Sequence, residues 1–407
     1  MPKRLKRQRK LSRMMVKLRK KQPGIIRQDR RLFGEISVNK PTDYLAEFDY
    51  FLLLVALGIT VIGLVYLHSA MSNMYLDGGR SGMRSQIFGL AVGLGAALFL
   101  AFFDYNLLKK ITVPFYLGNV LLMLAVFTPL GTEDGGSRAW LAFGSFTYQP
   151  SELMKLAMIL VVSVALERAE EEGFGFRHTA LITGAFLIPL GLTVLQKDIG
   201  QAMVFTFAFL TVLFVGKAKF WYILGVLAAG GAAVPFVWKF FLNGTRRARL
   251  FSFIDPEKYP DYSLQLTRSK TAIGSGGLTG QGLTQGAMNG GKKILVKMSD
   301  SIIAVIGEEG GFIMTALVIL LFLLLLGRMC FISARARDTF GKCVAAGIMA
   351  MFLFNIFENI GMNLGIMPIT GLPLPFVSKG GSAMITNYIC IGLLLSVSLR
   401  KKKDFFD

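Results

Sequence analysis

The chain contains 407 residues, of which 53% are hydrophobic and only 17% are charged, and its mean hydropathy is +0.54. A soluble domain of this length cannot bury so much apolar surface behind so few charges, and the composition also excludes disordered, collagen-like and disulfide-scaffold proteins. With only two histidines in the chain, a histidine-based metal cluster or a Ser-His-Asp triad is disfavoured. The expected fold class is therefore an all-α polytopic membrane protein.

The net charge of +20 is concentrated at the two ends of the chain. Fourteen Lys or Arg residues fall within residues 1–31, and a second basic cluster spans residues 400–403. Basic runs beside apolar spans are typical of cytoplasmic anchors on anionic lipid, so we expect contact with membrane lipid and none with nucleic acid. Residues 1–45 lack the apolar region of a signal peptide and are predicted to form a basic cytoplasmic tail, as a short amphipathic surface helix or a solvated segment.

Ten apolar stretches follow, each about long enough to cross a bilayer. They cover residues 50–70, 85–105, 111–131, 152–169, 179–198, 201–217, 220–241, 301–327, 339–366 and 384–399. Ten crossings place both termini on one side, and the loops on that side carry further Lys and Arg, as the positive-inside rule requires. The sequence predicts a transmembrane domain over residues 46–403, followed by a short C-terminal end at 404–407. Both termini are expected in the cytoplasm. A large extracytoplasmic loop is expected at about 242–300, between helices seven and eight.

Charged residues inside the apolar stretches are costly to insert, so each is a candidate functional residue. Glu152 and Lys155 are three residues apart and can pair on one helical face, with a structural ion pair as the alternative interpretation. Lys197 and Asp198, at a very short external turn, have the same two interpretations. Hydrogen bonding between helices explains Glu308 and Glu309 as well as catalysis does. A second polar stripe is interpreted as packing between helices. It consists of Asn355, Glu358, Asn359 and Asn363.

The large loop carries nine Lys or Arg residues against four acidic residues, which is unusual for an extracytoplasmic segment. Its glycine-rich run, residues 274–291, lacks the patterns of nucleotide-binding loops. Backbone amides freed by glycine are able to cradle a phosphate. A flexible re-entrant turn is the alternative interpretation of this run.

Asp300 stands where the basic loop meets the start of an apolar helix, shortly after Lys292, Lys293 and Lys297. One interpretation is a simple helix N-cap, a position that aspartate favours. The other is a general base at the membrane surface, among cations that hold an anionic lipid headgroup. A single carboxylate suffices as the base when the leaving group is already a good one, such as a diphosphate.

Four sequence blocks resemble those of the SEDS family (shape, elongation, division and sporulation) of polytopic glycosyltransferases, which includes RodA, FtsW and SpoVE. The blocks are GSRAW (136–140) with QPSELMK (149–155); KDIGQ (197–201); SKTAIGSGGL (269–278) with residues 299–300 and 308–309; and NIGM (359–362) with MPITGLPLPFVS (367–378) and GGS (380–382). The resemblance covers residues 48–403. The run 357–362 and its continuation look more like RodA than FtsW, which favours cell-wall elongation and shape maintenance over division.

This resemblance implies a peptidoglycan glycosyltransferase that polymerises lipid II into glycan strands at the outer face of the cytoplasmic membrane. The transfer is inverting and releases undecaprenyl diphosphate. The implied partner is a class B penicillin-binding protein, which crosslinks the strands. A lipid II flippase, an FtsW-like polymerase of division or sporulation, and a scaffold without catalysis are the alternatives. No cofactor is evident, and a divalent cation such as Mg²⁺ remains an option without a ligand set that demands it.

By resemblance, the catalytic residue is Asp300, as base or substrate-orienting carboxylate. The implied substrate-binding residues are Arg138, Trp140, Glu152, Lys155, Asp198 and Lys270. Among these we expect Arg138, Lys155 and Lys270 to contact the diphosphate. The chain departs from the family pattern at residues 298–303, at Lys197 where proline is usual, and at Lys379 where tyrosine is usual.

Overall fold

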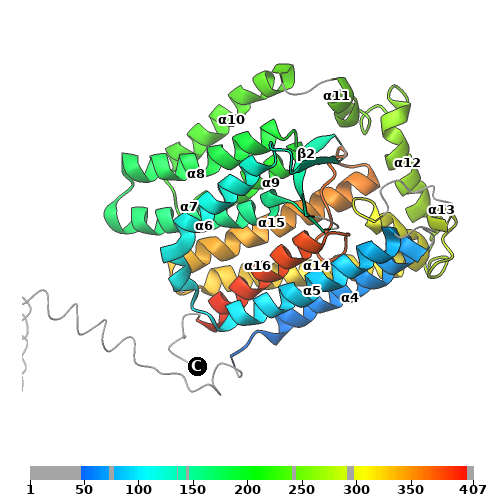
Figure 1. The fold of residues 1–407 in the computed structure, drawn as a ribbon, viewed down its shortest axis with the longest axis horizontal. Helices are drawn as coiled ribbons and strands as arrows, with labels where there is room; N and C mark the ends of the chain where they lie inside the picture. The colour runs from blue at the N-terminus through cyan, green and yellow to red at the C-terminus, as the bar shows by residue number, and fades with distance from the viewer. Residues whose placement is uncertain are drawn as a thin grey trace, which may run out of the picture. The chain divides into compact units, whose positions relative to one another are not determined.

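The computed structural model describes residues 47–72, 78–134, 136–143, 146–240, 244–290 and 298–400. The chain divides into two units, residues 1–48 and 49–407, and all helices and strands named below belong to the second (Figure 1). The predicted basic tail at 1–45 and the C-terminal end at 404–407 lie outside the described residues, as do Lys292, Lys293 and Lys297.

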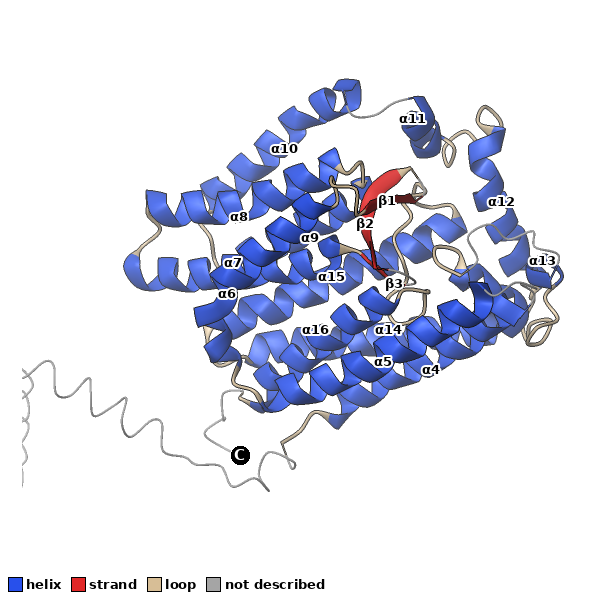
Figure 2. Ribbon diagram, in the orientation of Figure 1, coloured by secondary structure: helices blue, strands red, loops and turns tan. Residues whose placement is uncertain are grey.

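Each of the ten predicted apolar stretches coincides with a helix (Figure 2). The helices are α4 (Tyr50–Ser72), α5 (Gly78–Phe102), α6 (Tyr105–Ala125), α7 (Pro150–Glu172), α8 (Phe176–Leu195), α9 (Ile199–Val215), α10 (Phe220–Phe240), α14 (Ile302–Arg335), α15 (Thr339–Leu364) and α16 (Gly381–Leu399). Within the described residues, seven of them are long and apolar enough to cross a membrane, which supports a multi-pass membrane protein. The exceptions are α7, which carries several charges, and the shorter apolar segments of α9 and α10.

A small β-sheet corrects the all-α prediction. The predicted span 111–131 ends early, at Ala125, and three antiparallel strands follow in the order β1 (Gly131–Asp134), β2 (Ser137–Phe143), β3 (Phe146–Tyr148). Along β2, Ala139 and Leu141 are each 1% exposed, whereas Arg138 is exposed and Trp140 is partly exposed. This period-two alternation is typical of a half-buried strand and is the signal that the composition-based assignment missed.

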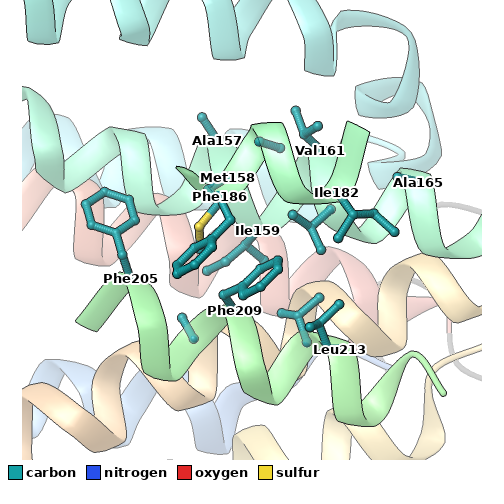
Figure 3. Close-up of a cluster of buried hydrophobic side chains, with 14 of the residues drawn as sticks. Ala157, Met158, Ile159, Val161, Ala165, Ile182, Phe186, Phe205, Phe209 and Leu213 are labelled. Carbon is teal, nitrogen blue, oxygen red and sulfur yellow. The ribbon is translucent and has the colours of Figure 1, made fainter. Parts of the chain in front are cut away.

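One cluster of buried apolar side chains is centred on α7, and its neighbours α8 and α9 pack against it (Figure 3). The rings of Phe186 in α8 and Phe209 in α9 stack in parallel with centroids 4.1 Å apart, and Ile159 of α7 lies beside them. Because lipid tails are as apolar as these side chains, close packing and not hydrophobic exclusion holds such helices together. The core therefore fixes the start of α7 against the α8–α9 turn, where the charged candidates lie.

Small residues allow α5 and α16 to approach closely. A Cβ atom at Gly89 would lie within 3 Å of the Gly381 backbone, and one at Gly392 would lie 2.6 Å from Ala97 Cα. Glycine and alanine contacts of this kind are typical of tightly packed membrane helices. The pairing brings the N-terminal end of α16 against α5.

The large loop contains three helices, α11 (Gly244–Phe251), α12 (Pro260–Ser275) and α13 (Ala287–Gly290). Its glycine-rich run pairs with a break in α14, where Gly311 has φ 68° and ψ −166°. The N–H groups of Phe312 and Ile313 donate to the carbonyls of residues 277 and 278, and the Glu308 and Glu309 carbonyls accept from residues 281 and 282. The amides at 280–282 are thus already bonded to protein carbonyls, which corrects the phosphate-cradle interpretation for this part of the run.

Gly311 is a position where alanine is expected to be strongly destabilising. Its backbone conformation is essentially restricted to glycine and costs other residues roughly 1–3 kcal/mol. A Cβ atom there would also meet the Gly280 nitrogen and lie 2.7 Å from the Leu278 carbonyl oxygen. We expect Gly311→Ala to lower the thermal unfolding midpoint of the detergent-solubilised protein.

Gly327 supplies the matched control in the same helix. A Cβ atom at Gly327 meets no atom within 4 Å, and alanine is a better helix former than glycine. Gly327→Ala is expected to keep or slightly raise the unfolding midpoint. Equal midpoints for both variants would contradict the role assigned to the break.

Candidate functional site

A buried ion pair lies at the start of α7. The Lys155 Nζ atom is 2.9 Å from Glu152 Oε1, which confirms the predicted pairing at three-residue spacing. Gln201 of α9 donates its Nε2 to the same Glu152 oxygen at 2.8 Å. Lys155 is fully buried and Glu152 is 3% exposed. This geometry fits the structural interpretation of the pair, and direct substrate contact by either residue stays a prediction.

Asp198 joins this cluster from the short turn between α8 and α9. It is the N-cap of α9, accepting from the Gln201 N–H at 3.1 Å, and its second oxygen accepts from Gln149 Nε2 at 3.2 Å. Burial raises the pKa of the Asp198 carboxyl to about 6, against the opposing effect of the hydrogen bond from Gln201. The preceding Lys197 has φ 64°, a backbone conformation that proline cannot adopt. The backbone of this turn therefore cannot be the same as in family members that have proline at this position.

Asp300 lies in a turn, residues 298–301, in which the carbonyl groups of three successive residues accept hydrogen bonds from other parts of the chain. The Met298 carbonyl accepts from the Lys379 N–H at 2.7 Å, and the Ser299 carbonyl accepts from the Ser378 hydroxyl. The Asp300 carbonyl accepts from two asparagine side chains of α15, as described below. Ser301, not Asp300, is the N-cap of α14, so the interpretation of Asp300 as that cap is wrong. These main-chain bonds fix the position from which the Asp300 side chain extends.

Asn359 and Asn363 are site residues that sequence reasoning assigned to packing. Their Nδ2 atoms donate to the Asp300 carbonyl oxygen at 3.0 and 2.8 Å. The four-residue spacing of the two asparagines, which places both on one face of α15, was the available signal. Only the fold reveals that this face meets residue 300, 59 residues earlier in the chain.

The α12 helix approaches the same turn from the other side. Gln265 and Ser269 both donate to the Ser301 hydroxyl oxygen, at 3.3 and 3.4 Å. Lys270, the next residue along α12, is exposed, and its ammonium lies against Gly365, the C-cap of α15. A cation at a helix C-terminus is favourable, and this contact places Lys270 near the asparagines that hold Asp300.

The α15–α16 loop, residues 365–380, connects the Asp198 cluster to the Asp300 turn. A Cβ atom at Gly200 would contact Thr370 and Leu372 of this loop at 3.1 Å, and one at Gly371 would lie 3.4 Å from Asp300 Oδ2. A small cavity lies beneath the loop. Polar side chains that line it are Glu152, Asn355, Ser378 and Asn387. The candidate site therefore has two acidic centres, around Asp198 and around Asp300, that share one loop.

Glu308 and Glu309 hold the large loop in place. Glu308 accepts from the N–H groups of Met288 and Asn289 at 2.6 and 3.0 Å. Glu309 accepts from the Ser69 hydroxyl at 2.7 Å and from the Asn289 side chain at 2.6 Å. Both carboxylates are buried. Their contacts support the interpretation that these acids bond helices and loop together, in preference to catalysis.

Arg138 and Trp140 lie on strand β2, which bonds to the same α8–α9 turn. The Arg138 N–H donates to the Gln196 carbonyl at 3.1 Å, and its guanidinium donates to the Thr128 carbonyl at 2.8 Å. Trp140 is partly exposed. The sheet therefore groups these two residues with the Asp198 cluster, and no contact with the Asp300 turn is observed for them within the described residues.

A divalent cation at this site stays a prediction. The part of the chain that the structure describes holds no group of three His, Cys, Asp or Glu side chains arranged around a metal. Mg²⁺ is usually held by one or two carboxylates together with substrate phosphates.

A multi-pass helical membrane protein with acidic centres gathered at one end of its bundle is the class that this fold and site define. The chain belongs to the FtsW/RodA/SpoVE family, because the family model described as "Cell cycle protein" matches residues 49–403. "Probable peptidoglycan glycosyltransferase FtsW" of Geobacter sp. (strain M18) is 35% identical over 373 residues, which cover 87% of this chain and 98% of the relative. "Peptidoglycan glycosyltransferase MrdB" of Escherichia coli K12 is 31% identical, covering 86% and 93%.

Solved structures give the same assignment. One, described as "Structural coordination of polymerization and crosslinking by a peptidoglycan synthase complex", matches with a TM-score of 0.71 and 30% identity, covering 86% of this chain and 97% of that one. "Rod shape determining protein RodA" of Thermus thermophilus matches with a TM-score of 0.63 and 28% identity, covering 88% and 98%.

Proposed function

We propose that this chain is a peptidoglycan glycosyltransferase that polymerises lipid II into glycan strands at the outer face of the cytoplasmic membrane. Its relatives over nearly the whole domain carry that enzyme name. The observation that carries the proposal is the Asp300 turn, which α12, α15 and the α15–α16 loop hold in place from three sides. A main chain anchored in this way fixes where the candidate base is attached, which supports a catalytic role.

In the proposed reaction, the 4-hydroxyl of the acceptor GlcNAc attacks the anomeric carbon of the donor MurNAc. The carbon–oxygen bond to the diphosphate breaks with inversion, and the electron pair leaves with undecaprenyl diphosphate. Asp300 takes the hydroxyl proton as the general base. Cations near the site stabilise the negative charge that develops on the departing diphosphate.

The proposed topology keeps ten crossings, with both termini in the cytoplasm. The β-sheet, the α8–α9 turn and the loop of residues 242–300 then face outward, together with Asp300. The basic composition of that loop suits the diphosphate of the substrate. The proposed partner is a class B penicillin-binding protein, supported by the structural similarity to a peptidoglycan synthase complex described as coordinating polymerisation and crosslinking.

Elongation and division are both supported by relatives. The run at residues 357–362 favours a RodA-like role in elongation, as do the MrdB and RodA matches. The 35% identity to an FtsW protein favours an FtsW-like role in division. The polymerisation chemistry is the same in both, so the choice concerns the partner and the place of synthesis in the cell.

The test is strand synthesis by the purified full-length protein, alone and with a class B penicillin-binding protein whose transpeptidase is blocked. Labelled lipid II is supplied, and products are separated by length on a gel. We expect ladders of glycan strands. Folded protein that binds lipid II but yields no ladder under either condition would contradict the polymerase and favour the flippase or scaffold.

A further inference from the structure

Of the three cations predicted to contact the diphosphate, Lys155 and Arg138 are bonded elsewhere and Lys270 lies at the C-terminus of α15. Lys155 is fully buried and paired with Glu152. Arg138 donates to a carbonyl of its own sheet region, and Lys270 lies against the C-terminus of α15. The mechanism needs a positive charge that faces the leaving group beside the Asp300 turn. We therefore expect another cation beside this turn to stabilise the departing diphosphate.

Lys379 is anchored directly to the Asp300 turn. Its N–H donates to the Met298 carbonyl at 2.7 Å, two residues before Asp300. Its two neighbours in the chain are held by one buried side chain of α5, because Gln86 Nε2 donates to the Ser378 carbonyl at 3.1 Å and Gln86 Oε1 accepts from the Gly380 N–H at 2.8 Å. The backbone of Lys379 is thus fixed on both sides relative to the candidate base.

The side chain of Lys379 runs outward along α5. A Cβ atom at Gly82 would lie 3.0 Å from Lys379 Cε and 3.4 Å from Nζ, so the ammonium end rests over Gly82. Gly82 lies near the N-terminal end of α5, just before the predicted apolar stretch of residues 85–105. The ammonium group consequently lies where the apolar span begins, the depth at which the headgroup of a membrane lipid is expected.

The ammonium of Lys379 is exposed and forms no ion pair with a described carboxylate. A cation without such a partner keeps its charge available to an anionic ligand. Because the backbone and not the side chain bonds to Met298, replacing the side chain leaves the anchoring of the turn intact. The position where tyrosine is usual in the family thus carries an additional positive charge in this chain.

We infer that Lys379 binds the diphosphate of the polyprenyl-linked substrate and stabilises it as it leaves. This inference rests on the proposed function and assigns its leaving-group contact. The hydroxyl of tyrosine is able to donate one hydrogen bond to a phosphate oxygen, whereas lysine adds a full charge to the interaction. Lysine acts as a point charge toward phosphate, so arginine is expected to substitute for it in part.

Binding measurements test the inference without relying on activity. The full-length protein in nanodiscs is titrated with fluorescent undecaprenyl diphosphate and undecaprenyl monophosphate, with phosphatidylglycerol as a competitor. The proteins are wild type, Lys379→Met, Lys379→Arg and Lys110→Met, the last removing an exposed charge at the start of α6. We expect Lys379→Met to weaken diphosphate binding about tenfold, which corresponds to about 1.4 kcal/mol, and to weaken monophosphate binding much less.

The controls separate the outcomes. Lys379→Arg is expected to retain most of the diphosphate affinity, and Lys110→Met all of it. Diphosphate affinity unchanged in Lys379→Met would overturn the inference. Equal weakening for diphosphate, monophosphate and phosphatidylglycerol would also overturn it, because Lys379 would then be a general contact to anionic lipid.

Kinetics distinguish failure of this inference from failure of the proposed function. If the wild type makes glycan strands, Lys379→Met is expected to raise the KM for lipid II and lower kcat, and Lys379→Arg to restore part of both. Wild-type kinetics in Lys379→Met would remove the inference and leave the polymerase standing. A wild type that binds undecaprenyl diphosphate through Lys379 but makes no strands would retain the inference as a binding site and remove the polymerase.

Discussion

Asp300→Asn is expected to abolish the formation of glycan strands by the purified protein. Asparagine has the shape of aspartate but cannot take a proton from the acceptor hydroxyl, and general-base catalysis typically contributes about 10²–10⁴-fold to the rate. The variant is expected to fold, because Asn359 and Asn363 bond the main-chain carbonyl of residue 300 and not its side chain. The measurement is the initial rate of lipid II consumption, beside lipid II affinity, which is expected to stay near the wild-type value.

Asp255→Asn supplies the matched control, since it makes the same change at an exposed carboxylate of the same loop. It is expected to polymerise at the wild-type rate. Asp198→Asn distinguishes the two acidic centres, because the pKa of Asp198, raised to about 6, also suits proton transfer near neutral pH. Strand synthesis that survives in Asp300→Asn and disappears in Asp198→Asn would transfer the role of base to Asp198.

Lys155→Met is expected to destabilise the protein severely. The substitution leaves Glu152 buried without its ammonium partner, and among the described residues the Gln201 side chain is then the remaining side-chain donor to it. Removing one partner of a buried ion pair typically costs about 3–5 kcal/mol, since the remaining charge is uncompensated. The expected result is a lower thermal unfolding midpoint and less monodisperse protein in detergent.

The double variant Glu152→Gln with Lys155→Met tests the cause. It removes the stranded charge while keeping a hydrogen-bonding group for Gln201, so we expect it to recover much of the lost stability. A single Lys155→Met protein that unfolds like the wild type but no longer binds lipid II would contradict the structural interpretation. It would then support the substrate contact predicted from the sequence.

Local pattern predicted the helices well. Each apolar stretch overlaps a helix, although one is displaced along the chain and seven of the helices in the described residues have the length and hydropathy of a membrane span. A helix that faces lipid must be apolar along its length whatever its neighbours are, so this signal is local. The same reasoning overlooked the three-stranded sheet. Its strands are only three to seven residues long, too short to register in a search for spans, and they were absorbed into the end of a helix and a loop.

Charge spacing predicted the Glu152–Lys155 pair for a similar reason, since residues three apart meet on one helical face in any fold. It did not predict that Gln201 completes the pair or that Glu309 bonds to Ser69, 240 residues earlier. Contacts of this range depend on which helices become neighbours. A single sequence gives the type of each side chain but does not indicate which distant residue it will hydrogen-bond to.

The sequence by itself determined the membrane class, the family through its motifs and the charged residues to examine, because composition and spacing act locally. Only the tertiary structure decided how Asp300 is held: by asparagines of α15, by Gln265 and Ser269 of α12, and by the loop that carries Lys379. These groups come from segments far apart in the chain, and hydrogen bonds act only over about 3 Å. Their meeting at one turn is therefore a product of helix packing.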